Sequence, residues 1–172
     1  MTVILVSGYK NTDLGIFKDN DPRIVIIKKA IKRQLERYLD AGLKWLIFTG
    51  NLGFEYWVLE VAQDLKREYD FSIGTVFCFA NQGENWNDSN REKLAAFKQV
   101  DFVKYSYEAY QNPTQFRCYN EFLVENSDGA YLFYSHEHET NLKYLYDKMV
   151  EKENYPIKIL DFDELNEIFY EE

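Results

Sequence analysis

The residues best placed for chemistry in this 172-residue chain form a glycine-rich turn followed by a carboxylate. Gly50, Asn51 and Gly53 make the turn, and Glu55 falls in the first turn of the helix that we expect next. Glycines let a backbone approach a ligand, and free N–H groups at a helix start favour anions. Glu55 stabilises the helix through its dipole, or it binds a ribose hydroxyl or acts as a general base. A plain tight turn is the alternative, because the segment matches neither GxGxxG nor a Walker A loop.

A second candidate is the loop that begins Gly8-Tyr9-Lys10 and runs to Asn20. Connections in α/β units usually have about 2–6 residues, so a loop of this length is often functional. Lys10 offers a point charge for a phosphate. The alternative is a surface flap that carries apolar side chains onto the edge of the core.

Aromatic and amide side chains suggest a place for a nucleobase, which needs stacking and hydrogen bonds together. Trp86 lies in a loop that also holds Asn81, Gln82, Asn85 and Asn87. A partly buried structural tryptophan explains the same residues. Further candidates that could face the same cleft or stack on a base are Tyr9, Gln115, Phe116, Asn120 and Tyr134.

Metal and thiol chemistry is disfavoured. His136-Glu137-His138-Glu139 fits a solvated loop better than a metal site, because neighbouring side chains usually point apart and no third ligand is visible. Cys78 and Cys118 are the only cysteines and have no zinc spacing. We expect no metal, and Cys78 should be an inert buried thiol within an apolar strand.

The elements that must position these residues alternate along the chain. Six short apolar runs predict strands at Thr2–Ser7, Lys44–Thr49, Ser72–Phe79, Asp101–Tyr105, Gly129–Tyr134 and Pro156–Leu160. Helical patterns predict helices from Asp21-Pro22 to Gly42, over Phe54–Tyr69, Asp88–Gln99 and Thr114–Asn126, around Leu142–Met149, and over Asp163–Phe169. Such alternation favours a doubly wound α/β fold, with a mostly parallel sheet of about six strands and helices on both faces. We expect one domain over residues 1–172.

This fold places any ligand beyond the carboxyl ends of the strands, where the strand order reverses. The loops after the strands therefore matter most, and they contain the candidates named above.

Composition limits the partners. The 20 basic and 29 acidic residues give a net charge of −9, which argues against non-specific nucleic-acid binding. The segment Lys18–Arg37 is locally basic, but a solvated helix face explains it better than a nucleic-acid surface. No apolar run is long enough for a signal peptide or a membrane span, so we expect a cytoplasmic protein without a membrane partner. The chain has 30 aromatic side chains, and those that are exposed would favour self-association into a homo-oligomer.

Several of these motifs occur together in one order. They are Gly8-Tyr9-Lys10, Leu14-Gly15-Ile16-Phe17, Gly50-Asn51-Leu52-Gly53-Phe54-Glu55, Asn85-Trp86, Pro113-Thr114-Gln115-Phe116 and Ser127-Asp128-Gly129. The pattern spans nearly the whole chain and resembles the YpsA-like family of Gram-positive bacteria, in the SLOG superfamily of Rossmann-like folds. That superfamily includes DNA-processing protein A and the Lonely-guy phosphoribohydrolases.

The resemblance implies that Gly50–Glu55 lines a pocket for a nucleotide-derived ligand such as an ADP-ribose or NAD-like molecule. It also implies a link to cell division or stress, and with it a protein partner. Phe116 and Asn120 resemble a segment of DNA-processing proteins, but Tyr119 and Glu121 replace its basic pair. The glycine-rich phosphate loop of Lonely-guy enzymes is absent after Tyr134.

Three functions follow in order of preference. The first is a module that binds and senses a nucleotide-like ligand. The alternative is a hydrolase acting on an N-glycosidic or phosphoester bond with Glu55 in its site, and the third is nucleic-acid binding. No residue selects the ligand or a cofactor.

Overall fold

A computed structural model of the chain describes residues 2–171. Its centre is one six-stranded sheet in the order β4-β3-β2-β1-β5-β6, and all five strand pairings are parallel. The strands are β1 (Val3–Gly8), β2 (Trp45–Phe48), β3 (Ser72–Phe79), β4 (Phe102–Tyr107), β5 (Gly129–Phe133) and β6 (Ile157–Leu160). The predicted doubly wound, parallel α/β fold is therefore confirmed.

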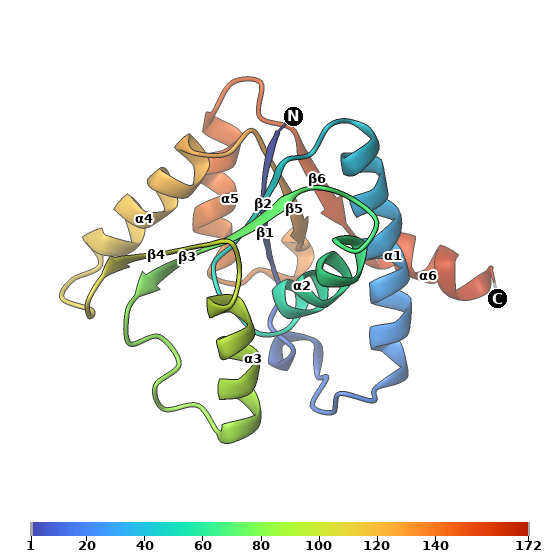
Figure 1. The fold of residues 1–172 in the computed structure, drawn as a ribbon, viewed down its shortest axis with the longest axis horizontal. Helices are drawn as coiled ribbons and strands as arrows, with labels where there is room; N and C mark the ends of the chain where they lie inside the picture. The colour runs from blue at the N-terminus through green and yellow to red at the C-terminus, as the bar shows by residue number, and fades with distance from the viewer. Residues whose placement is uncertain (1, 172) are drawn as a thin grey trace.

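Helices cover both faces of the sheet (Figure 1). They are α1 (Pro22–Asp40), α2 (Phe54–Leu65), α3 (Asp88–Lys98), α4 (Thr114–Glu125), α5 (Leu142–Glu151) and α6 (Phe162–Tyr170). Right-handed crossovers put α1 to α3 on one face, because β1 to β4 step in one direction. The chain then returns to β5 and β6, which puts α4 and α5 on the other face, and α6 packs against α1.

The helix α1 shows how the sequence sets an element. Pro22 suits the first helical turn, and the carboxylate of Asp21 caps the helix by accepting a hydrogen bond from the N–H of Arg23 at 2.9 Å. The apolar residues at steps of three and four are buried against the sheet and its neighbours; they are Ile24, Ile27, Ile31, Leu35 and Tyr38. The apolar stripe predicted from the spacing is confirmed.

The structure differs from the predicted elements mainly at their ends. The fourth strand begins one residue late because Asp101 lies before it, where its carboxylate accepts hydrogen bonds from the N–H of Ile73 at 2.9 Å and from Lys66 at 2.7 Å. The second helix ends at Leu65, four residues earlier than expected. Two short 3-10 helices, Thr12–Leu14 and His136–His138, were not predicted.

The strand order reverses between β1 and β5. These two central strands pair from Ile4 opposite Gly129 to Gly8 opposite Phe133, so their carboxyl ends stop side by side. The loops after β1 and β3 both lie at the bottom of Figure 1. Across residues 2–171, no helix combines the length and the apolar character needed to cross a membrane.

Candidate functional site

Glu55 organises the loop after β2. Its side chain is fully buried, and Oε1 accepts hydrogen bonds from the N–H groups of Thr49 at 2.6 Å and Gly50 at 3.1 Å. Oε2 accepts from the Thr49 hydroxyl and from the Asn51 side-chain amide at 3.3 Å. With four donors on two oxygens, the carboxylate fixes the end of β2, the glycine turn and the start of α2 as one unit.

This environment shifts the acidity of Glu55. Burial raises the pKa of its carboxyl to about 7, and the hydrogen bonds from Thr49, Gly50 and Asn51 oppose that rise. The buried Tyr119 of α4 lies near this hydrogen-bond network, and its hydroxyl donates to the carbonyl of Val76 in β3. Burial, with the nearby Glu55 as a smaller cause, raises the pKa of Tyr119 well above its usual value.

The turn glycines are needed for close packing of the protein against itself. Gly53 has φ of +82°, and a Cβ there would lie 2.4 Å from the backbone nitrogen of Asn11. The N–H of Phe54 donates to the carbonyl of Tyr9 at 3.0 Å, so the first loop covers part of the α2 N-terminus. A Cβ on Gly50, which has φ of +89°, would lie 2.3 Å from the ring of Phe77.

The first loop is anchored by close contacts of Gly8 and Tyr9. A Cβ on Gly8 would lie 2.5 Å from the ring of Phe54. Tyr9 is 2% exposed; its hydroxyl donates to the carbonyl of His138 at 2.8 Å and accepts from the N–H of Ser135 at 2.8 Å. Tyr9 therefore ties the β1 end to the loop after β5, and its ring offers no open face for a base.

Lys10 is the exposed cation of this edge. Its backbone N–H donates to Asp13 at 2.8 Å, and its side chain makes no ion pair within residues 2–171. Since Gly53 packs against the Lys10–Asn11 backbone, Lys10 stands beside the glycine turn. The structure thus brings together Gly8, Tyr9, Lys10, Gly50, Asn51, Gly53 and Glu55.

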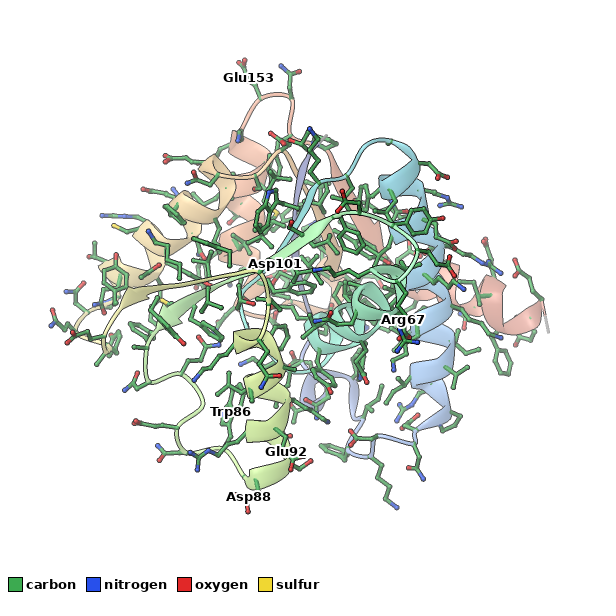
Figure 2. The ribbon with its side chains drawn as sticks, in the orientation of Figure 1. Arg67, Trp86, Asp88, Glu92, Asp101 and Glu153 are labelled. Atoms are coloured by element: carbon green, nitrogen blue, oxygen red, sulfur yellow. The ribbon has the colours of Figure 1, made fainter. Side chains whose placement is uncertain are left out.

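Trp86 lies in the loop between β3 and α3, close to α3 (Figure 2). Its ring is half-buried, and a Cβ on Gly83 would lie 2.9 Å from it. Gln82 of the same loop donates its side-chain amide to the carbonyls of Thr49 at 3.2 Å and Gly50 at 3.1 Å. This loop is therefore joined to the glycine turn.

The remaining candidates do not share one cleft. Gln115 closes its own loop: its Oε1 accepts from the N–H of Gln111 at 2.7 Å. Phe116 is 48% exposed and contacts the ring of Phe79, with centroids 5.6 Å apart. Tyr134 is 1% exposed, and its ring is a core ring like that of Tyr9. Asn120 is half-buried on α4, on the opposite face of the sheet from α2.

An apolar cavity of about 220 Å³ lies beside the switch point, between the first loop, α1 and α6. Phe133 at the end of β5 and Phe162 of α6 both line it, with ring centroids 5.4 Å apart.

Sequence reasoning missed Phe162, because nothing in the pattern of α6 shows that it returns to the β1 edge. It also missed Thr49, which bonds the nearby Glu55, and it missed Ser135 and Tyr119, which bond Tyr9 and Val76 far away in the sequence. Among residues 2–171, no three His, Cys, Asp or Glu side chains converge as metal ligands.

An all-parallel, doubly wound sheet with a glycine turn at the carboxyl edge of its central strands defines a Rossmann-like α/β protein. The chain belongs to the YpsA family, because the family model described as the YspA SLOG family matches residues 4–165.

Relatives agree with this assignment over nearly their full length. A UPF0398 protein of Streptococcus agalactiae is 61% identical over 170 residues, 99% of each chain. UPF0398 protein YfdB of Lactococcus lactis subsp. lactis is 56% identical over 171 residues, 99% of this chain and 98% of that one. DNA processing protein A from Helicobacter pylori has a similar structure with a TM-score of 0.58, covering 99% of this chain and 73% of that chain. At 12% identity, this last likeness shows the fold alone.

Proposed function

We propose that this protein binds and senses a nucleotide-derived small molecule of the ADP-ribose or NAD class at the carboxyl edge of β1 and β2. The observation that carries the proposal is the geometry of the glycine turn. Backbone N–H groups at its start donate hydrogen bonds to the buried Glu55, and the exposed Lys10 lies beside it. The N–H groups of Leu52, Gly53 and Glu55 have no acceptor among residues 2–171, and helix N-terminal N–H groups bind phosphate. The apolar Phe133–Phe162 cavity is of a kind that takes the flat part of such a ligand.

Sensing suits the site better than hydrolysis. A general base needs a free lone pair within reach of its proton, whereas both oxygens of Glu55 accept hydrogen bonds and the side chain is fully buried. Hydrolysis with Glu55 as base would require the network of Thr49, Gly50 and Asn51 to open first. A ligand bound beside the loops after β1 and β2 would instead change the surface offered to a partner protein, and the family resemblance supports a partner in cell division or stress.

Calorimetric titration with ADP-ribose, NAD and ATP tests the proposal. We expect saturable binding of at least one of them without turnover, weakened about tenfold or more by Lys10→Glu, because a cation close to a phosphate becomes an anion. Lys10 is the better position to change than Gly53 or Glu55, since both of those are packed or hydrogen-bonded within the protein.

The matched control is Lys44→Glu, an exposed lysine just before β2 at the opposite edge of the sheet. It makes the same change in net charge and should leave the affinity unaltered. Uniform absence of binding across the three ligands, or equal loss in Lys10→Glu and Lys44→Glu, would contradict a phosphate site at the glycine turn.

A further inference from the structure

We propose that a second cavity, between the β3–α3 loop and α3, binds the phosphate of a small sugar phosphate through Arg91 and Lys98. The cavity has a volume of about 310 Å³, at the lower end of the range for small-molecule sites. It is separate from the Phe133–Phe162 cavity and shares no lining residue with it. The inference does not rest on nucleotide binding at the glycine turn.

The charges of α3 support an anionic ligand. Arg91 and Lys98 are two helical turns apart, so they lie on one face, and both line the cavity. Neither forms an ion pair with another described residue, although the protein has nine more acidic than basic residues. By contrast, Lys93 on another face of α3 pairs with Asp19 at 2.6 Å. The acids of α3 labelled in Figure 2, Asp88 and Glu92, do not line the cavity.

The rest of the lining fits a sugar. Asn81 and Glu84, both exposed on the loop side, offer an amide and a carboxylate that can bond hydroxyl groups. Leu94 and Ala95, which lie between Arg91 and Lys98 on the same face of α3, add an apolar wall. A phosphate bound by Arg91 and Lys98, with hydroxyl groups bound by Asn81 and Glu84 on the loop, would meet groups of matching chemistry.

Two residues that line the cavity connect it to other parts of the protein. Gly83 lines it and packs against the ring of Trp86, so a ligand that moves the loop should change the environment of that indole. Gln82 lines it too and donates to the carbonyls of Thr49 and Gly50, which connects the loop to the glycine turn.

Nuclear magnetic resonance of the ¹⁵N-labelled full chain, titrated with ribose 5-phosphate to about 10 mM, tests this inference, because that range detects a Kd of about 1 mM. We expect saturable shifts of the Trp86 indole and of the backbone amides of residues 80–84, and no such shifts with ribose alone. Arg91→Gln and Lys98→Gln should each weaken binding about tenfold, because each removes a charge-assisted hydrogen bond.

Two controls make the outcome decisive. Arg67→Gln removes an exposed cation just after α2, outside the cavity, and should leave the Kd unchanged. Lys10→Glu should also leave it unchanged, which separates this cavity from the proposed nucleotide site. Ala95→Phe should abolish binding by filling the cavity, with circular dichroism to check the fold. Absence of shifts, equal binding of ribose, or an unchanged Kd in either Arg91→Gln or Lys98→Gln would overturn the inference.

Discussion

At the scale of single residues, Glu55 carries the most information about how the site is built. A carboxyl group moved out of water resists ionisation, and four hydrogen bonds only partly offset that resistance. Its folded-state pKa of about 7 lies above its ordinary value of 4.5, so the folded protein holds a proton on this group more firmly than the unfolded chain does. The local stability of the glycine turn is thereby linked to pH.

The first prediction concerns the pH dependence of stability. Between about pH 4.5 and 7 the folded protein binds more protons at Glu55 than the unfolded chain does, so the free energy of unfolding falls as pH rises. Glu55→Gln removes this titration. Urea unfolding should therefore show wild type losing about 3 kcal/mol relative to Glu55→Gln across that window, at 1.36 kcal/mol per pKa unit.

Glu60→Gln is the control for that measurement, because Glu60 lies on the same helix but is partly exposed and paired with Lys28 at 3.1 Å. Its difference from wild type should change little over the same window, since surface pairs contribute about 0–1 kcal/mol. A difference between wild type and Glu55→Gln that does not vary with pH would refute the linkage.

At the scale of elements, the second prediction separates backbone strain from steric clash at the turn between β2 and α2. Gly53→Ala forces a side chain into a left-handed conformation and against Asn11, whereas Gly15→Ala, at φ of +66°, meets open space. We expect thermal or urea unfolding to show a loss of about 1 kcal/mol for Gly15→Ala and about 3 kcal/mol or more for Gly53→Ala. Similar small losses at both positions would mean that the first loop does not pack on the turn.

These elements also show what the sequence could reveal. Periodicity and β-branched runs predicted all six strands and all six long helices, because each element buries a face whose spacing is local. The site was harder to predict from the sequence. Gly50-Asn51-Leu52-Gly53 predicted an approach of the backbone to a ligand, whereas the segment that packs against Gly53 in the structure is Lys10–Asn11. Tyr9 was a candidate for stacking, yet its hydroxyl bonds Ser135 and His138, partners about 130 residues away that no local pattern indicates.

At the scale of the whole molecule, the distribution of charge matters more than its sum. The basic helix α1 meets acids from three other places: Arg23 pairs with Asp21 before the helix, Lys28 with Glu60 of α2, and Arg33 with Glu171 at the chain end. These contacts pair three basic residues of the segment Lys18–Arg37 with acids. The likeness to DNA processing protein A of Helicobacter pylori, at 12% identity, is one of fold alone.

The last prediction follows from this neutralisation. Binding to a phosphate backbone depends on Lys and Arg that release counterions, so a protein of net charge −9 with paired cations on α1 should not bind single strands. Fluorescence anisotropy with a labelled oligo-dT of about 30 nucleotides should show no binding at about 10 μM protein and about 0.15 M salt, where non-specific Kd values are typically 10⁻⁴–10⁻⁶ M. The double variant Glu60→Gln/Glu171→Gln frees Lys28 and Arg33 and should bind weakly, with an affinity that falls as salt rises. Salt-dependent binding by wild type at comparable strength would show that the pairs do not mask α1, and would restore nucleic acid as a partner.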